Sequence, residues 1–458
     1  MITTETITGA AVPRGAYGEL RAMARLALPV VLVQVGMLTM GAVDTAIVGR
    51  LSAQALASVA LGNLYFFNAS IFSMGALMAL DPLVAQAVGA RDMAGAARAV
   101  QRGLVLAVLL SALTSLLLLG IGPLLALTRQ QPEVVPGATR YVHISIVGVL
   151  PYLGFVVLRQ SLQALGHLRP IVVTIVIANL ANLVLDWALV FGHWGFPAMG
   201  VDGSAWATAA CRWLMLLLLP VLDWRTLRRT LVPIAHDLLA RRPLARMLRL
   251  GAPIGGHQLL EAAAFGTVGL LMGMLGTNEV AGHQVAINLA ALTFMVPLGV
   301  GAAAAVRVGY AVGAGEPRRA RQAARAALVV GVGFMCCTAL LFLALPTALA
   351  RIFTADVGVL AVAAALIPIA GIFQVFDGIQ AVAAGILRGA GDTHVPMLIA
   401  LVGFWLVGVP VSALLAFRTG AGAAGLWWGF VAGLGVVALI LLWRVRTRLR
   451  RTLTRIEH

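Results

Sequence analysis

The fold is decided by two short stretches that each occur twice, 224 residues apart: ALPV (27–30) returns as GAPI (251–254), and AQAVGA (85–90) returns as GYAVGA (309–314). The offset is the same at both places, so about 60 residues align without a gap. This pattern indicates an internal duplication, with the second half of the chain built on the same plan as the first.

The composition indicates a membrane protein. The chain has 458 residues, of which 61% are hydrophobic and 11% charged, and its mean hydropathy is +0.97. Soluble domains carry about 25% charged residues. Windows of about 20 apolar residues, long enough to cross a bilayer, are expected at 22–48, 57–87, 98–126, 139–164, 170–191, 201–222, 247–275, 281–311, 322–350, 360–386, 395–417 and 423–444.

The duplication and the spans together predict an all-α polytopic membrane protein with twelve transmembrane helices in two six-helix repeats. Each repeat has an even number of spans, so the two repeats run parallel. The expected regions are an N-terminal segment (1–21), an N-lobe bundle (22–222), an inter-lobe linker (223–246), a C-lobe bundle (247–444) and an Arg-rich tail (445–458).

The distribution of positive charge predicts the orientation. The net charge is +16, and all 33 basic residues are arginines. Twenty-five of them fall on the side of the N-terminus and five on the opposite side, which predicts cytoplasmic termini. Residues 1–20 are polar and the first apolar stretch is too long for a signal peptide, so no cleavage is expected. The arginines suit an anionic lipid surface rather than a nucleic acid.

Five carboxylates interrupt the apolar spans: Asp44, Asp81, Asp186, Glu261 and Asp377. An ionisable residue at the centre of a membrane costs about 2.5–3.5 kcal/mol on insertion scales, so its presence indicates a function. The repeat strengthens this interpretation for three of them, because Asp44, Glu261 and Asp377 align with apolar or aromatic residues in the other copy. Asp81 precedes Pro82, and its role is left open between structure and function.

In the C-terminal half, Glu261 and Asp377 are the candidates for binding the coupling ion. Gln284 lies on a third span and could add an oxygen ligand, while His257 lies one turn before Glu261 on the same helix face. Carboxylate and amide oxygens suit a hard monovalent cation or a proton. The alternative interpretation is a hydrogen-bonded packing network between helices.

In the N-terminal half, Asp44 is expected to form a second polar cluster. Asn182 and Asp186 are four residues apart and share a helix face. Thr208, on the next span, could add a hydroxyl. This set forms the predicted N-lobe site.

Several activities are excluded by what the sequence lacks. A chain without lysine has neither a Walker A lysine nor a Schiff-base lysine, and no HExxH, CxxC or GxSxG motif occurs. The three cysteines fit helix packing rather than a disulfide framework. We therefore expect no enzyme, no catalytic residues and no cofactor, and transport driven by an ion gradient remains.

The residues also resemble a known family. VDTAIVG (43–49), PLVAQAVGA (82–90), AGHQVAINLAALTFMVPLGVGAAAAVRVG (281–309) and FDGIQAVAAGILRGAGDT (376–393) are similar to the multidrug and toxic compound extrusion (MATE) family, NorM-type branch, and the likeness runs over about residues 20–445. The resemblance implies two six-helix bundles arranged in a V. It also implies antiport in which a cation enters as amphipathic, often cationic, drugs leave.

The resemblance further implies a cation site at Glu261 and Asp377 and an N-lobe site around Asp44. Sodium is the usual coupling ion of this branch, and the proton is the alternative, because Phe294 and Phe373 stand where related sites often carry tyrosine. Candidates for lining a substrate cavity are His257, Phe265, Phe294, Phe373 and Gln374.

We expect a monomer in the bacterial inner membrane, with small organic molecules and membrane lipid as partners and no nucleic acid. The runner-up function is a lipid-linked oligosaccharide flippase of the same superfamily fold, which would favour a cationic cavity. An intramembrane aspartyl enzyme is a more distant rival, and no motif supports it. Drug spectrum and stoichiometry are left open by the sequence.

Overall fold

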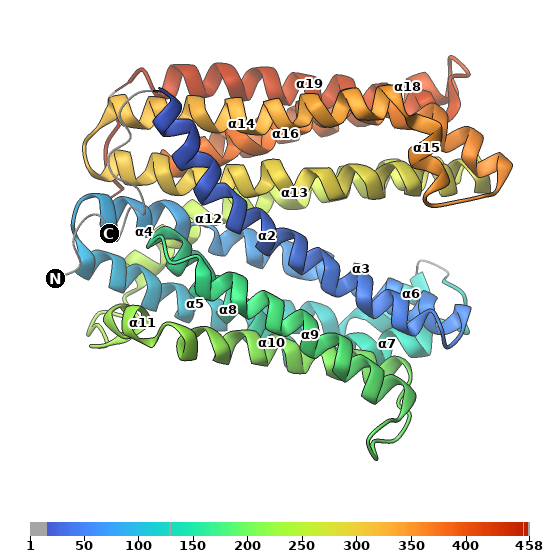
Figure 1. The fold of residues 1–458 in the computed structure, drawn as a ribbon, viewed down its shortest axis with the longest axis horizontal. Coiled ribbons are helices and arrows are strands. Elements are labelled where there is room, and N and C mark those ends of the chain that lie inside the picture. Colours follow the sequence, from blue (N-terminus) through green and yellow to red (C-terminus); the bar gives the residue numbers. More distant parts are fainter. Residues whose placement is uncertain (1–15, 128–129, 452, 457–458) are drawn as a thin grey trace. The chain divides into compact units, whose positions relative to one another are not determined.

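The structure, a computed structural model, describes residues 16–127, 130–451 and 453–456, and every regular element in these ranges is a helix (Figure 1). The helices of the first half are α2 (Ala16–Val48), α3 (Ala53–Leu77), α4 (Leu80–Gly89), α5 (Met93–Leu119), α6 (Ile121–Leu127), α7 (Val135–Ser145), η1 (Ile146–Gly148), α8 (Val149–Ala164), α9 (Arg169–Phe191), α10 (Val201–Leu222) and α11 (Trp224–Leu231). Those of the second half are α12 (Arg241–Gly273), α13 (Thr277–Gly313), α14 (Pro317–Ala344), α15 (Pro346–Arg351), α16 (Val357–Gly389), α17 (His394–Ala400), η2 (Leu401–Gly408), α18 (Val409–Phe417) and α19 (Gly422–Arg448). Most of the predicted segment 1–21, and positions 452, 457 and 458 of the predicted tail, lie outside the described residues.

The protein is an all-α polytopic membrane protein, as predicted. Eleven helical segments of the described chain are long and apolar enough to cross a membrane, and they coincide with eleven of the twelve predicted spans. The remaining predicted span, 247–275, is the helix α12, whose 33 residues are long enough. Its hydropathy is lower because it carries His257, Gln258 and Glu261 in its middle. The same polar residues that are candidates for a functional site lower the mean hydropathy of this helix.

The described chain divides into two compact units, and the boundaries fall inside two helices. The first unit comprises Leu32–Gly255, and the second comprises α2 up to Val31 together with the chain from Gly256 onwards. Val31 and Gly255 are 224 positions apart, the same offset as the sequence repeat. Thus α2 begins in the second unit and ends in the first, while its duplicate α12 does the reverse.

The contacts around these boundaries repeat as well. In the second unit, Gly299 of α13 packs directly against Val31. In the first unit, Gly255 of α12 packs against Phe72 and Ala76 of α3. Each glycine allows two helices to approach at backbone distance, as small residues do in membrane helices.

The second unit is built around α13 and α16, which pack against each other. Both contact α14, and α16 also contacts α19. The backbone of Gly385 on α16 meets the carbonyl of Gly301 on α13, and a methyl group at Gly385 would collide with it. In the first unit the main neighbours are α9 with α10, α5 with α8, and α3 with α7.

The predicted linker 223–246 contains the short helix α11 and then enters α12. Within the first unit, Gln101 of α5 attaches this segment to the bundle by hydrogen bonds. The Gln101 side-chain amide donates a hydrogen bond to the carbonyl of Thr230 at 3.0 Å, and its oxygen accepts one from the backbone N–H of Ala235 at 2.9 Å. The segment is therefore attached to the bundle along part of its length.

Candidate functional site

Three helices of the first unit place the predicted N-lobe residues side by side. The carboxylate of Asp44 on α2 accepts a hydrogen bond from Asn182 of α9 through Oδ1 and one from Thr208 of α10 through Oδ2, both at 2.9 Å. All three side chains are buried, with Asp44 only 1% exposed. Charge-assisted bonds of this kind are about twice as strong as neutral ones, so they fix the carboxylate on the α2–α9–α10 junction.

Asp186 completes this cluster without a hydrogen-bond partner of its own. It lies beside Asp44, Asn182 and Ser204, and it is fully buried. Both of its carboxylate oxygens lack a hydrogen-bond partner, as does the side-chain oxygen of Asn182. Two neighbouring buried carboxylates cannot both be charged without a cation or a proton between them. The arrangement therefore combines two acids, an amide oxygen and a hydroxyl with spare acceptor capacity.

Tyr141, which is not among the residues predicted from sequence, lies next to this cluster. Tyr141 lies on α7, is 1% exposed, and donates a hydrogen bond from its hydroxyl to the Asn63 side chain at 2.9 Å. It interacts electrostatically with Asp44 and Asp186 and lies close to Thr208. A phenol hydroxyl inside an apolar span was the only available signal, and nothing in the spacing connected it to residues 44 or 186.

Two buried arginines were also missed. The Arg212 guanidinium on α10 lies 3.7 Å from the centre of the Phe66 ring and 5.6 Å from that of Tyr152, a cation–π arrangement. Arg159 on α8 donates a hydrogen bond to the Gln34 side chain at 3.0 Å and lies near Asp81. The interior of the first unit therefore contains fixed positive charges as well as acids.

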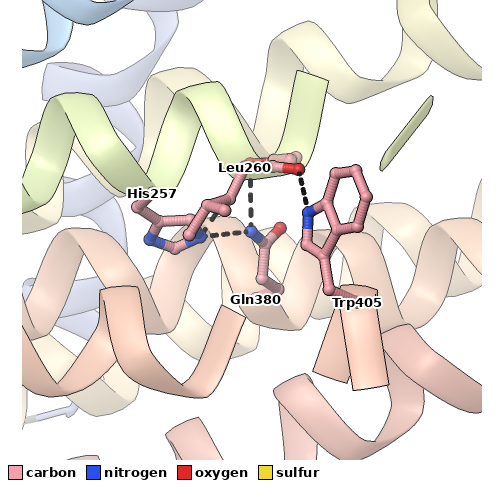
Figure 2. A network of polar contacts seen from close by, with 5 residues as sticks. His257, Leu260, Gln380 and Trp405 are labelled. Carbon is pink, nitrogen blue, oxygen red and sulfur yellow. Dashed lines mark hydrogen bonds and ion pairs between the residues drawn. The ribbon is translucent and has the colours of Figure 1, made fainter. Parts of the chain in front are cut away.

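In the second unit, Glu261 forms a network with two nitrogen-bearing side chains (Figure 2). Gln380 of α16 donates a hydrogen bond from Nε2 to Oε2 of Glu261 at 3.3 Å, and His257 Nε2 lies 3.0 Å from the same Gln380 nitrogen. His257 Nε2 also lies 3.9 Å from Glu261 Oε2. Trp405, labelled in Figure 2, donates from its indole to the carbonyl of Leu260 at 3.1 Å.

Asp377 lies near Glu261, close enough for the two carboxylates to interact electrostatically. It is 6% exposed, and its Oδ1 has no hydrogen-bond partner. The structure therefore brings together the two acids expected at the ion-coupling site. In the described part of the chain, the polar partners of Glu261 are the nitrogens of Gln380 and His257, and the side-chain oxygen of Gln380 has no hydrogen-bond partner.

Gln284 is not part of this cluster, contrary to expectation. Its side chain is exposed, and its amide donates to Asn288 one turn further along α13 at 3.0 Å. The position is on α13 as predicted, but the helix face that carries Gln284 is not the one that packs on α16. A span assignment gives the helix, whereas the face that meets Glu261 depends on tertiary packing.

The candidates for lining a substrate cavity are split between the interior and the surface of the second unit. Phe373 and Gln374 are 1% and 0% exposed, so in this structure they have almost no surface to offer a ligand. Phe265 is partly buried and packs edge-on against Phe373, with ring centres 5.8 Å apart. Phe294 is partly buried on α13, and His257 is buried in the network described above. Phe373 and Gln374 are thus core residues here.

No ion pair within the described residues joins an arginine to one of the clustered acids, although Arg212 interacts electrostatically with Asp44. Among the ion pairs within the described part of the chain, the only partner of these acids is His257 beside Glu261. No group of three or more His, Cys, Asp or Glu residues that could hold a metal occurs among the residues described. The hydrogen bonds to Asp44 and Glu261 come from neutral side chains, and Arg212 adds a positive charge near Asp44.

A duplicated helical membrane protein with an acid pair buried in each half has the architecture of a membrane transporter. The comparison with known families agrees, because residues 29–188 and 253–414 each match the MatE family. The chain belongs to the MatE family, in its NorM-type branch. The two matched segments correspond to the two copies of the repeat.

The relatives are bacterial resistance proteins. A probable multidrug resistance protein NorM of Mesorhizobium japonicum is 38% identical over 441 residues, covering 93% of each chain. The multidrug resistance protein PmpM of Pseudomonas aeruginosa is 36% identical over 444 residues, covering 94% of this chain and 92% of that protein.

Solved structures of the same fold include the eukaryotic MATE transporter AtDTX14. It superimposes with a TM-score of 0.87 at 25% identity, over 95% of this chain and 98% of that one. The Vibrio cholerae MATE transporter VcmN in its bent form has a TM-score of 0.83 at 20% identity and covers 95% and 98% of the two chains. The second likeness concerns the fold alone.

Proposed function

We propose that this protein is a multidrug efflux transporter that exports amphipathic organic compounds in exchange for an inward-moving cation. The names of its relatives support drug export. The observation that carries the coupling is the buried pair Asp44 and Asp186, in which one acid is fully hydrogen-bonded and the other has two free oxygens. Such a pair changes its charge when a cation enters, and that change is what an antiporter requires.

The first-unit cluster is the better candidate for a sodium ion. Sodium prefers several oxygen ligands, and Asp44, Asp186, Asn182 and Thr208 provide carboxylate, amide and hydroxyl oxygens in one place. A proton is the alternative cation, since it needs only the acid pair. Sodium remains our first choice and the proton the second.

In this proposal, the pair Glu261 and Asp377 of the second unit is a further acid site that a cation neutralises. Its nitrogen-rich surroundings suit a proton better than a metal ion, because Gln380 and His257 bring N–H groups or a ring nitrogen to the carboxylate. Charged, this pair would attract a cationic drug; neutralised, it would release it. The export step then requires the cation to bind the two states of the transporter with different affinities.

The buried arginines favour a second kind of cargo. Arg212 and Arg159 place positive charge inside the first unit, and a cationic interior is what an anionic lipid-linked cargo would require. The flippase activity therefore stays as the second candidate. Replacing Arg212 by Gln should widen the range of exported cations if the protein is a drug exporter, and should abolish cargo movement if it is such a flippase.

The decisive experiment is a flux measurement with purified protein in liposomes. Ethidium movement would be followed while a sodium gradient and a pH gradient are imposed separately, in wild type and in the variants Asp186→Asn and Glu261→Gln. We expect one gradient to drive ethidium and the Asp186→Asn variant to lose the response. Ethidium movement in wild type that ignores both gradients would refute antiport.

For the setting, we propose the bacterial inner membrane with both termini in the cytoplasm and a monomer as the working unit. The arginine asymmetry of the sequence supports this orientation.

A further inference from the structure

A groove on the outside of the first unit runs between the ends of α2 and α9. Its volume is about 430 Å³, and it is lined by Val43, Ala46, Ile47, Arg50, Leu183, Val184, Trp187, Phe191 and Trp194. None of these residues belongs to the acid cluster. The groove is therefore a separate feature of the same pair of helices.

The groove and the acid cluster lie on opposite sides of the contact between α2 and α9, which we call the seam. On α2, Val43 and Ile47 line the groove, while Asp44 between them points into the unit. On α9, Leu183 and Trp187 line the groove, while Asp186 is fully buried. An exposed apolar helix face in a polytopic membrane protein is suited to contact with lipid chains. The apolar lining of the groove therefore fits an acyl chain.

The lining changes from apolar to polar along its length. Val43 lies five helical residues before the end of α2 at Val48, which is about 7.5 Å along the helix axis at 1.5 Å per residue. Arg50 lies two residues beyond the end of α2, and Phe191 is the last residue of α9. Tryptophan and arginine are the residues that mark the membrane–water interface. The gradient matches a phospholipid, with its head group at Arg50 and its chains against Val43 and Leu183.

The aromatic end of the groove is held in a costly conformation. Trp194 has φ +58°, a left-handed value that is uncommon outside glycine. In that conformation the Trp194 ring lies edge-on to the Trp187 ring, with ring centres 5.6 Å apart. The His193 ring stacks on Trp187 at a centre-to-centre distance of 3.9 Å. Backbone strain of this kind is kept at places that clamp a ligand.

Arg50 supplies the charge. It is exposed, and none of the ion pairs within the described ranges includes it. A guanidinium forms paired hydrogen bonds with phosphate oxygens. The chains of any lipid gain little by entering the groove, because lipid is as apolar as its lining. Selection must therefore come from the head group.

We propose that this groove is a binding site for an anionic phospholipid, whose phosphate is held by Arg50 and whose chain lies between α2 and α9. Because the Asn182–Asp44 hydrogen bond crosses the same seam, an occupied groove would stabilise the acid cluster. That consequence for transport rests on the proposed function, whereas the lipid site does not.

The test is native mass spectrometry of the full-length protein in detergent with phosphatidylglycerol or phosphatidylethanolamine. Wild type should retain phosphatidylglycerol in preference. Arg50→Gln should lower this preference about fivefold, the value expected for one basic residue at a membrane surface. Arg418→Gln, at an exposed arginine beyond α18, is the matched control and should leave the preference unchanged.

A second variant tests the groove itself without changing charge. Leu183→Trp fills the groove at a residue that is 47% exposed, so folding should survive, and the preference should again be lost. Leu414→Trp, at a leucine that is 55% exposed on α18, is its control.

Equal retention by wild type and Arg50→Gln would overturn the site. Loss of a dimer instead of a lipid in Leu183→Trp would overturn it too, in favour of an interface between two copies. Retention of ethidium in place of lipid would make the groove a drug site and would likewise overturn the proposal. Since no gradient is used, normal lipid retention with no transport would count against the proposed function alone.

Discussion

Replacing Asp44 and Asp186 in turn by asparagine should change stability in different ways while abolishing coupling in both cases. Asp44 accepts two hydrogen bonds at 2.9 Å. An asparagine at position 44 would have one acceptor oxygen and one NH2 group. The NH2 group would face one of the two donors, Asn182 or Thr208, and leave it without an acceptor. Losing a charge-assisted bond and leaving a buried donor unpaired costs about 2–3 kcal/mol. Asp44→Asn should therefore lower the unfolding temperature by a few degrees.

Asp186→Asn should behave differently, because neither oxygen of Asp186 has a hydrogen-bond partner to lose. The change also removes one of two neighbouring acids. At about 4 Å and an effective dielectric constant of 20, like charges repel by roughly 4 kcal/mol, which is an upper limit here because a bound cation or proton reduces it. We expect the stability of Asp186→Asn to be equal to that of wild type or higher.

The assay is the apparent unfolding temperature in detergent at one scan rate, measured with and without the coupling ion. A ligand at 100 times its Kd stabilises the folded state by about 2.7 kcal/mol, so wild type should gain several degrees with the correct ion and both variants should gain nothing. Asp202→Asn is the control, since Asp202 forms an ion pair with the exposed Arg140 at 3.3 Å and lies outside the acid cluster. Equal destabilisation by both asparagine variants, or a retained response to the ion, would refute the reasoning.

Three further outcomes are expected in the second unit. Glu261→Gln should reduce gradient-driven ethidium efflux at least about tenfold, because a carboxylate at membrane depth is retained for its charge. Its size-exclusion elution profile should be unchanged, and normal efflux would count against a role for the acid pair. Gln284→Ala should leave efflux within about twofold of wild type, because the Gln284 amide is exposed and donates to the exposed Asn288. A large loss of efflux would mean that Gln284 joins the acids in another state. Gly385→Leu should destabilise the bundle by about 1–3 kcal/mol or more, because its side chain would force α16 away from the backbone of Gly301. The comparison is the unfolding curve of Gly333→Leu, at a glycine with free space around it.

The helices could be predicted from sequence because a bilayer requires one signal repeated many times. About twenty apolar residues between polar breaks define a span whatever surrounds it. The 224-residue repeat also predicted that α2 and α12 are equivalent helices of the two copies. Where spans are broken, as at Met78 between α3 and α4, the hydropathy stays high and the break is invisible.

The acid sites were only partly predictable. A carboxylate in an apolar span is conspicuous, and the spacing of Asn182 and Asp186 gave their common face. The partners of these acids were not conspicuous, since Tyr141 and Gln380 look like ordinary residues of a membrane helix. Arg212 was not predicted, because its burial depends on packing against the ring of Phe66, a contact that the sequence does not reveal. Gln284 was misplaced because its helix face is set by the packing of α13 on α16.

The passage of α2 from one unit to the other has a consequence for biosynthesis. Glu19, near the start of α2, pairs with Arg307, which lies 288 residues further along the chain. At roughly 5–20 residues per second, the start of α2 waits about 15–60 s after its synthesis for its partner on α13. Until then its apolar face is available to insertases and chaperones, and neither half of the gene alone encodes a complete bundle.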